Sequence, residues 1–143
     1  MTHTNPDEIS RIFNRAPFIA DLGIRLDSIA PGECHTSLVL AERHLQQDGY
    51  VHAGVQATIA DHTAGAAAAS LAATGHHVLT AGFSINLLRA AKGSHLTCVA
   101  RVLKAGSSLT VVESEVFCGL PGEARMVSKA TVTLAVVGPR DEA

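Results

Sequence analysis

The sequence has 143 residues, of which 47% are hydrophobic, 17% charged and only 3% aromatic. This composition excludes a disordered chain, and the length predicts one domain over residues 1–143 with a sizeable hydrophobic core. The formal net charge is -2, so no overall positive charge attracts nucleic acid or an anionic membrane, and neither is expected as a partner. An anionic ligand must therefore be met by a local group of basic residues.

The cysteines and the N-terminal segment predict a cytoplasmic protein. Cys34, Cys98 and Cys118 form no CxxC pair, and an odd number of cysteines without paired spacing is typical of reduced thiols. Residues 1–10 are polar and lack the apolar stretch of a signal peptide. The most apolar run, residues 64–73, is too short to span a bilayer.

The first predicted elements are a short helix and a hairpin. Asn5 is a suitable N-cap for a helix whose apolar residues fall on one face, and Pro17 marks the end of that helix. Apolar and polar residues alternate over residues 23–30, as they do in a half-buried strand. Residues 33–40 follow a Pro-Gly turn, so we expect them to be the hairpin partner of that strand.

One long helix and four further strands are predicted next. The helix covers residues 54–73, where no helix breaker occurs, and Gly75 is its predicted stop. The strand-like runs have the spacing of a meander and cover residues 77–90, 94–104, 108–119 and 125–137. This order of elements is typical of the α+β class with an antiparallel sheet.

The predicted long helix carries a stripe of small residues along one face. Small side chains allow another backbone to approach closely, as in a helix enclosed by a strongly curved sheet. Asp61 is the exception on this stripe, because burying an ionised carboxylate costs several kcal/mol unless it is paired. Asp61 therefore has either a functional role or a structural one. In the structural case its carboxylate lies at a solvated edge of the helix or is neutralised by His62. The members of the stripe are Gly54, Ala57, Thr58, Asp61, Ala64, Gly65 and Ala68.

His52 directly precedes the predicted helix. A helix N-terminus has unpaired N–H groups and the positive end of the helix dipole, which together can stabilise an oxyanion. We expect the backbone N–H of Ala53 or Gly54 to be the donor, with His52 shaping the loop. The alternative is an ordinary exposed loop histidine.

Other chemistries find little support in the sequence. His52, Asp61 and His62 do not have the spacing of metal ligands, so no metal site is expected. No GxSxG elbow and no glycine-rich phosphate loop occurs, and the cysteines fall inside predicted strands. Four basic residues near the ends of two strands that we expect to be adjacent could hold phosphates as a group: Arg89, Lys92, Arg101 and Lys104.

At residues 49–65, GYVHAGVQATIADHTAG, the sequence resembles the hotdog-fold acyl-CoA thioesterases of the phenylacetate-pathway (PaaI) type, which are related to the hydroxybenzoyl-CoA thioesterases. The run FSINLLRAAKG at residues 83–93 is similar to a later strand of that family. The resemblance implies a curved antiparallel sheet wrapped around one long central helix. The matching positions of the main motif are Gln46, Gly49, His52, Ala53, Gly54 and Asp61.

The resemblance also implies roles for individual residues. Asp61 matches the catalytic carboxylate, which acts as nucleophile or as base for water. Gln46 matches a residue near the thioester, and the N–H of Ala53 matches the group that polarises the thioester carbonyl. Thr80 matches the hydroxyl that holds the water in some members. The sequence departs from the family pattern with Ala for Gly at 53, Gln for Asn at 46 and Ala90-Ala91 where Pro is common.

Coenzyme A would be part of the substrate, and no other cofactor is implied. Arg89, Lys92 and Lys104 are the candidate contacts of its phosphates. The acyl group could be aryl or a medium aliphatic chain, because the few aromatic residues suit either pocket.

The helical spacing of the candidate residues adds a prediction about assembly. Ala53 and Asp61 are eight residues apart, which is about 12 Å of helical rise. One thioester carbon must lie roughly 3 Å from both the attacking atom and the oxyanion donor. Two antiparallel helices related by a twofold axis satisfy this requirement, whereas one helix cannot. We therefore expect composite active sites in a homodimer or in a tetramer of dimers.

The sequence predicts an acyl-CoA thioesterase and leaves two alternatives. One is a hotdog dehydratase or hydratase of acyl thioesters that uses His52 and Asp61 as acid and base. The other is an acyl-CoA-binding module without catalytic activity, which would not need Asp61.

Overall fold

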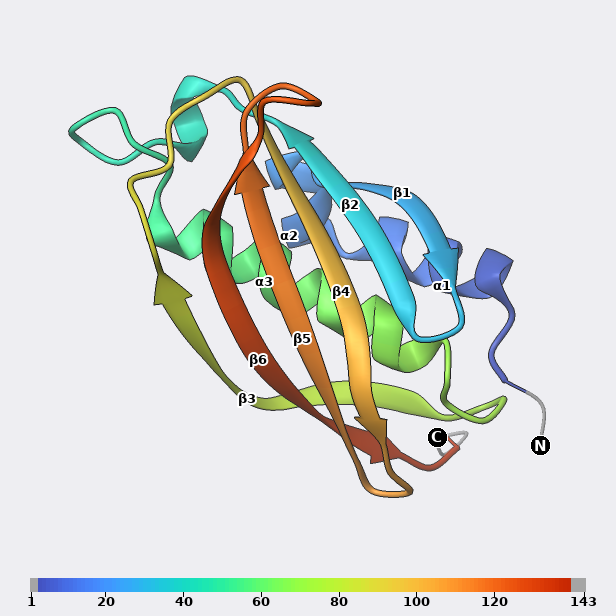
Figure 1. Ribbon diagram of the computed structural model, residues 1–143. Helices are drawn as coiled ribbons and strands as arrows, with labels where there is room; N and C mark the ends of the chain where they lie inside the picture. The colour runs from blue at the N-terminus through green and yellow to red at the C-terminus, as the bar shows by residue number, and fades with distance from the viewer. Residues whose placement is uncertain (1–2, 140–143) are drawn as a thin grey trace.

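A computed structural model of the chain describes residues 3–139, in which an antiparallel sheet wraps around one long helix (Figure 1). The elements in chain order are α1 (Pro6–Arg15), α2 (Pro17–Leu22), β1 (Arg25–Ala30), β2 (Glu33–Val39), the short 3-10 helix η1 (Glu42–His44), α3 (Ala53–Ala69), β3 (His77–Leu87), β4 (His95–Ala105), β5 (Leu109–Cys118) and β6 (Arg125–Val137). Within these residues no helix is long and apolar enough to cross a membrane.

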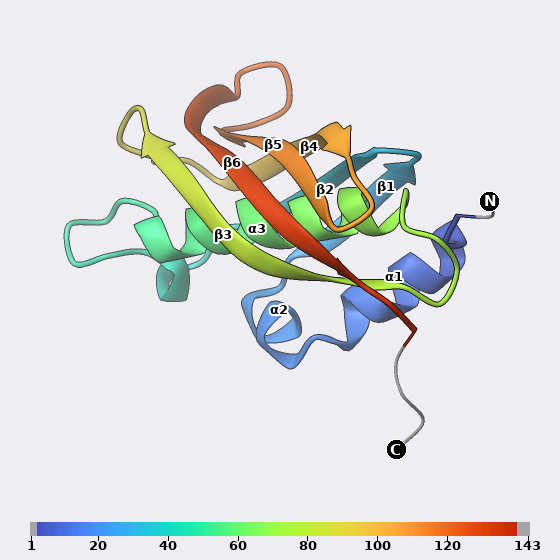
Figure 2. The ribbon, with the colours of Figure 1, turned by 90° about the horizontal axis from the view of Figure 1, so that it is seen from below.

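The molecule has three layers. The six-stranded sheet has the order β1-β2-β4-β5-β6-β3, and every neighbouring pair is antiparallel. The helix α3 lies against the concave face of the sheet, and α1 and α2 lie on the side of α3 that faces away from the sheet (Figure 2). The predicted class, a curved antiparallel sheet around a central helix, is confirmed.

The predicted meander is correct for β4, β5 and β6 but wrong for β3. β3 pairs with β6, from His77 opposite Val137 to Leu87 opposite Ser128, so two strands, β5 and β6, lie between β3 and β4. The connection from β3 to β4 does not form a hairpin, because its backbone bonds to the loop before α3, with Val51 N–H donating to Ala91 O at 2.9 Å. β3 is therefore an edge strand of the sheet. β4 follows it in the sequence but does not pair with it.

The face of α3 that contacts the sheet is not the predicted stripe of small residues. Val55, Ile59 and Thr63 are buried against the sheet, whereas Gly54 is exposed and Asp61 only partly buried. Two hydrogen bonds fix this orientation: the Thr36 and Thr63 hydroxyls lie 2.7 Å apart, and Ser114 Oγ donates to Ala60 O at 2.8 Å. The N-terminal half of the stripe is consequently exposed or only partly buried within one chain, and only its later members Ala64 and Ala68 are buried.

The two N-terminal helices differ in part from the prediction. Asn5 caps α1, its side chain accepting from Asp7 N–H at 2.7 Å, as expected. Pro17 follows the end of α1, but it also begins the second helix α2, which the sequence analysis did not predict. Proline is common in the first helical turn because its missing N–H would have no partner there.

The long helix ends earlier than predicted. α3 stops at Ala69, and Ser70 forms its C-cap, with its Oγ donating to Ala67 O at 2.6 Å and accepting from Gly32 N–H at 2.8 Å. Gly75 has a φ of +86° and lies in the turn that leads into β3, so it is not the helix stop. The hydrogen bond between Ser70 and Gly32 of the β1–β2 turn, together with the bond to Ala67, accounts for the earlier end.

Candidate active site

The loop before α3 folds back on itself in the manner of a hairpin. His52 N–H donates to His44 O at 2.9 Å, and Gln46 N–H donates to Tyr50 O at 2.8 Å. Gly49, with a φ of +87°, provides the left-handed backbone that the turn requires. Gln46 and His52 are thereby held on one compact loop at the N-terminus of α3.

His44 anchors this loop to α2. The side chain is buried, and its Nδ1 accepts from Ala41 N–H at 2.9 Å. Nε2 therefore carries the proton and donates to Leu22 O at 2.8 Å. No local sequence pattern predicts this role of His44, because its contact with Leu22 depends on the fold.

Hydrogen bonds at the start of α3 distinguish the two candidate oxyanion donors. His52 is the N-cap, and its Nδ1 accepts from Gly54 N–H at 2.8 Å. His52 O accepts from Val55 N–H and Gln56 N–H. Among the described residues, no acceptor is found for Ala53 N–H. The N–H group that is free to bind an oxyanion at this helix end is thus that of Ala53. His52 was expected only to shape the loop, and the structure shows that its side chain caps the helix.

The side chain of Gln46 is oriented by its own loop. Its Oε1 accepts from the N–H groups of Asp48 and Tyr50, which leaves the amide NH₂ as a donor. Gln46, His52 and Ala53 line one surface groove, together with Arg89 from the segment after β3. One half of the predicted site, the half that can donate hydrogen bonds, is therefore assembled within a single chain.

The other half of the predicted site lies further along α3. Thr80 Oγ1 of β3 donates to Asp61 Oδ1 at 2.7 Å, so the structure brings these two predicted residues together. No hydrogen bond or ion pair within residues 3–139 engages Asp61 Oδ2. Asp61 lies between two hollows, a cavity of about 280 Å³ and a shallower groove that Phe18 and Phe83 also line.

His62 does not neutralise Asp61. Its ring packs against Phe13 of α1, with ring centroids 4.3 Å apart. Burial lowers the pKa of His62, and this effect exceeds those of the Asp61 charge and of a hydrogen bond to the Phe13 backbone, which raise it. His62 is therefore neutral at pH 7, and the structure excludes the interpretation of Asp61 as a carboxylate paired with its neighbour.

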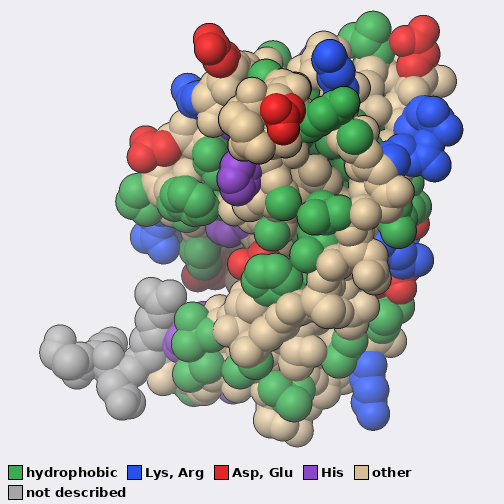
Figure 3. Space-filling model, turned by 90° about the vertical axis from the view of Figure 1, so that its left-hand side faces the viewer, with side chains coloured by type: hydrophobic (Ala, Val, Ile, Leu, Met, Phe, Trp, Pro, Cys, Tyr) green, Lys and Arg blue, Asp and Glu red, His purple; other side chains and the backbone are tan. Residues whose placement is uncertain are grey.

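The two halves of the predicted site are separated within one chain. Asp61 lies eight residues after Ala53 on an uninterrupted helix, a rise of about 12 Å. Both lie on the side of the molecule where α3 and β3 are uncovered. Figure 3 views the molecule from this side, where hydrophobic side chains gather around a recessed acidic group.

Comparison with known proteins identifies the family to which this site belongs. Residues 48–124 match the sequence profile of the Thioesterase superfamily. The chain belongs to this superfamily. As a thioesterase it hydrolyses thioesters, and a small-molecule thioester is its class of substrate.

Solved structures support this assignment. The thioesterase is 34% identical to a thioesterase family protein from Silicibacter pomeroyi, with a TM-score of 0.88 over 92% of this chain and 96% of that one. It is 29% identical to a conserved protein from Pseudomonas aeruginosa, with a TM-score of 0.81 over 90% and 99% of the two chains. A thioesterase from Haemophilus influenzae, 17% identical, shares the fold with a TM-score of 0.85 over 99% and 96%. No curated protein gives a significant match.

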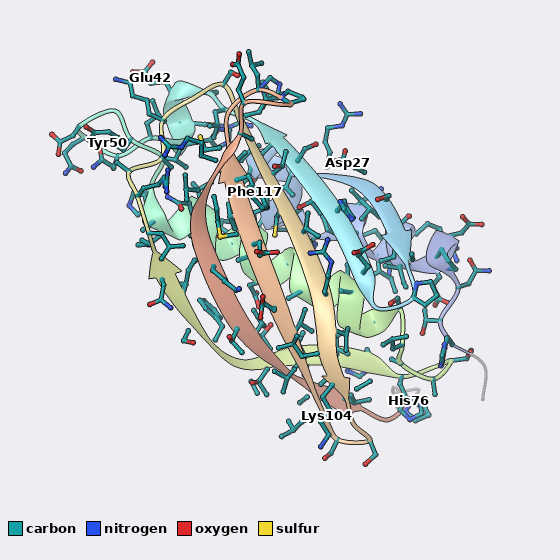
Figure 4. All side chains as sticks on the ribbon, viewed as in Figure 1. Asp27, Glu42, Tyr50, His76, Lys104 and Phe117 are labelled. Carbon is teal, nitrogen blue, oxygen red and sulfur yellow. The ribbon has the colours of Figure 1, made fainter. Side chains whose placement is uncertain are left out.

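The structure places the predicted basic residues of the thioesterase apart from one another. Arg89 lines the groove beside Ala53. Lys104 lies on β4, and Val111 of β5 and Thr133 of β6 separate it from Gly82 of β3, so it is three strands away from the strand that carries Thr80. Figure 4 shows Lys104 and the loop of Tyr50 at opposite ends of the molecule.

The expectation that these basic residues lie on adjacent strands is wrong, since two strands separate β3 from β4. Lys92 lies in the connection between them. Arg101 is engaged elsewhere, because its guanidinium bonds to Glu33 at 2.8 Å and to Glu115 at 3.3 Å.

Neither the thiols nor a metal cluster offers an alternative centre in the part of the chain that the structure describes. Cys34, Cys98 and Cys118 are buried and unpaired. Burial raises the pKa of the Cys34 and Cys98 thiols to about 12 and also raises that of Cys118, so they are poor nucleophiles at neutral pH. No group of three or more His, Cys, Asp or Glu side chains over residues 3–139 could hold a metal ion.

Proposed function

We propose that the thioesterase hydrolyses an acyl-CoA thioester to the free acid and coenzyme A, and that it is of the phenylacetate-pathway type. The observation that carries the proposal is Asp61, a partly buried carboxylate that Thr80 holds at 2.7 Å on the uncovered face of the central helix, beside a cavity. A carboxylate kept in this position without a cationic partner is suited to nucleophilic or general-base chemistry.

The arrangement supports a simple reaction. Thr80 fixes Oδ1 of Asp61, so Oδ2 either attacks the thioester carbonyl or takes a proton from the attacking water. Where Oδ2 itself attacks, loss of the thiolate leaves an anhydride between the acyl group and Asp61, and water then hydrolyses this anhydride to release the free acid. The Ala53 N–H stabilises the oxyanion, a contribution of about 3 kcal/mol for one such donor. The Gln46 NH₂ lies beside it as a second donor. The carbon–sulfur bond then breaks, and coenzyme A leaves as a thiolate that takes up a proton.

We further propose that the active site is composite and forms between two copies of the chain. The stripe at Gly54, Ala57 and Asp61 is exposed or only partly buried, and its small side chains allow a second α3 helix to approach closely in an antiparallel direction. The edge strand β3 exposes Leu79, Phe83 and Leu87, and exposed apolar edges are uncommon in stable monomers. In such a homodimer, Asp61 of one subunit faces Ala53 of the other; a tetramer would combine two such dimers.

A panel of aryl and aliphatic acyl-CoAs with a thiol reagent tests the proposed reaction. Release of free thiol with loss of the thioester absorbance is the expected result. A change in double-bond absorbance without thiol release would instead indicate a dehydratase or hydratase. Binding without turnover would indicate a non-catalytic module.

Replacement of Arg89 or Lys104 by alanine is expected to raise KM several-fold and to reduce its dependence on salt, with kcat nearly unchanged. The reason is that phosphate contacts bind the ground state and the transition state equally. Initial rates at several salt concentrations measure the effect.

Arg101→Ala is the matched control for these variants, because Arg101 is held by Glu33 and Glu115 on the outer face of the sheet. Its KM is expected to match that of the wild type. An unchanged KM in both Arg89→Ala and Lys104→Ala would mean that neither residue contacts the phosphates.

A further inference from the structure

The helix α1, which lies beside α3 and the start of β3 (Figure 2), contacts α3 through a histidine. The ring of His62 on α3 packs against the ring of Phe13 on α1, with centroids 4.3 Å apart and ring planes tilted by 56°. Phe13 and Ile9 of α1 are buried, and both line the cavity of about 280 Å³ together with His62. His62 is therefore part of the surface that holds α1 in place.

Two further histidines line the same cavity. His76 directly precedes β3 (Figure 4), and His77 is the first residue of β3. Each of the three imidazoles has one ring nitrogen that is buried and has no hydrogen-bond partner among the described residues: Nε2 of His62, Nδ1 of His76 and Nδ1 of His77. Buried polar atoms are nearly always hydrogen-bonded, because an unpaired one costs free energy. Three such atoms around one cavity therefore require a physical explanation.

A proton on His62 would turn its unpartnered nitrogen into a charged donor. A neutral imidazole carries hydrogen on one ring nitrogen, whereas an imidazolium carries hydrogen on both. Nε2 of a protonated His62 would have to donate, and within residues 3–139 no partner is found for it. Burial of the ring lowers the pKa of His62 accordingly, against the smaller opposing effects of Asp61 and the Phe13 backbone. Docking of α1 thus favours the neutral imidazole.

The N-terminal helices, all of whose residues the structure describes, place no charged side chain against His62. The side chains that line the cavity and the adjoining groove from this part of the chain are apolar: Ile9, Ile12, Phe13, Ala16, Phe18 and Ile19. The charged residues of the two helices are exposed and line neither hollow: Asp7, Glu8, Arg11, Arg15 and Asp21. A protonated His62 would therefore face apolar helices that offer it neither an acceptor nor a counter-charge.

The other side of the cavity holds one acid and two further bases. Asp61 is the one carboxylate among the described lining residues, and Thr80 already donates to its Oδ1. His76 and His77 line the cavity from the start of β3. Three protonated imidazoles would share the single counter-charge of Asp61 and repel one another. Charge on one of them therefore adds to the cost of charge on the next.

We propose that the docking of α1 depends on pH: α1 is docked while His62, His76 and His77 are neutral, and uptake of protons by these imidazoles loosens α1 and opens the cavity beside Asp61 to water. His62 is the central residue, because its ring contacts α1 directly. This property is independent of the proposed acyl-CoA hydrolysis, so either proposal can fail without the other.

Docking of α1 is expected to weaken as the pH falls below the ordinary histidine pKa of 6.5. The pKa of His62 is lower in the docked state than in the released state, so His62 stabilises docking above pH 6.5. Below that pH the released state takes up the proton, and docking loses this stabilisation. Between pH 7.5 and pH 5.5, His62 alone lowers the docking equilibrium constant by up to about tenfold, and His76 and His77 add to this change.

Hydrogen–deuterium exchange of the α1 amides tests the proposal. An isolated helix as short as α1 is not stable in water, so its amides exchange when it is released, and their protection factors report docking. Corrected for the intrinsic pH dependence of exchange, protection of α1 in the wild type should fall by at least about tenfold from pH 7.5 to pH 5.5. Protection of the central strand β5 should not change over this range.

Substitutions assign the response to the histidines. His62→Leu keeps an apolar contact with Phe13 and cannot be protonated, so the fall in α1 protection should be clearly smaller. The triple variant His62→Leu, His76→Gln, His77→Gln should show no fall. His35→Gln is the matched control, because His35 is exposed on β2 beside Glu33, at 3.6 Å, and does not line the cavity. Its response should equal that of the wild type.

Three results would overturn the inference. The first is an unchanged protection of α1 in the wild type at pH 5.5. The second is a fall of wild-type size in His62→Leu, or in His62→Gln if the leucine variant does not fold. The third is an equal loss of protection in β5, which would show that acid destabilises the whole domain rather than the docking of α1.

Discussion

Asp61→Asn is expected to lower kcat by at least about a hundredfold on the best acyl-CoA, because the amide can neither attack the carbonyl nor accept a proton from water. The substitution preserves the shape of the side chain, and the oxygen of the new amide can still accept the hydrogen bond from Thr80. Acyl-CoA binding should persist, and Tm should be unchanged or higher, since relief of site strain often stabilises an enzyme.

Asp27→Asn is a matched control for this experiment. Asp27 Oδ1 also accepts a hydrogen bond from a hydroxyl, that of Ser37 at 3.0 Å, but it lies on β1, away from α3 and β3. Its kcat is expected to equal that of the wild type. A folded Asp61→Asn variant with near wild-type turnover would show that Asp61 is structural and that the mechanism is wrong.

Ala53→Pro is expected to lower kcat by about a hundredfold or more while the protein stays folded. Proline removes the N–H that we assign to the oxyanion, and loss of one such donor costs about 10²–10³ in kcat. The backbone tolerates the change for two reasons. Ala53 is the first residue of α3, where proline is favoured, and His52 has the extended conformation that proline requires of the preceding residue, with φ -59° and ψ 136°.

Ala53→Gly is the control that distinguishes the effect of the backbone N–H from the effect of the side chain at this position. It keeps the donor, so its kcat should stay close to that of the wild type, and stopped-flow or steady-state rates compare the variants directly. If Ala53→Pro hydrolyses the substrate as fast as Ala53→Gly does, the oxyanion is stabilised by another group.

The sequence predicts the strands well where alternation is strong. The runs expected at 94–104, 108–119 and 125–137 agree with β4, β5 and β6 to within one residue at every end, because each strand buries every second side chain over most of its length. The position of β3 in the sheet could not be predicted in this way. β3 pairs with β6, a strand that is distant in the sequence. The segment between β3 and β4 does not form a hairpin turn, because Ala91 O accepts a hydrogen bond from Val51 N–H in the loop before α3.

The sequence predicts a set of candidate site residues but not how they are arranged. The motif predicts Asp61, Thr80, Gln46 and Ala53, and the structure joins Asp61 to Thr80 and places Gln46 beside Ala53. Which of the two N–H groups, that of Ala53 or that of Gly54, is free to bind an oxyanion depends on the direction of the His52 ring. The local sequence does not determine this direction.

The orientation of α3 also could not be predicted from its sequence alone. The residues on both of its faces are small or apolar, so periodicity does not indicate which face meets the sheet. The hydrogen bonds from Thr63 to Thr36 and from Ser114 to Ala60 settle the orientation, and both span distant parts of the chain. With that face on the sheet, Asp61 is left on the uncovered side, where a second subunit can complete the site.

The most direct test of the composite site is the activity of a mixture of Asp61→Asn and Ala53→Pro chains, unfolded together and refolded. Each variant alone is expected to be nearly inactive. In a mixed dimer one site carries both substitutions and the other carries neither, so an equal mixture should recover about a quarter of the wild-type activity. Activity that stays at the level of the separate variants, in a mixture shown to contain mixed dimers, would contradict a site shared between two subunits.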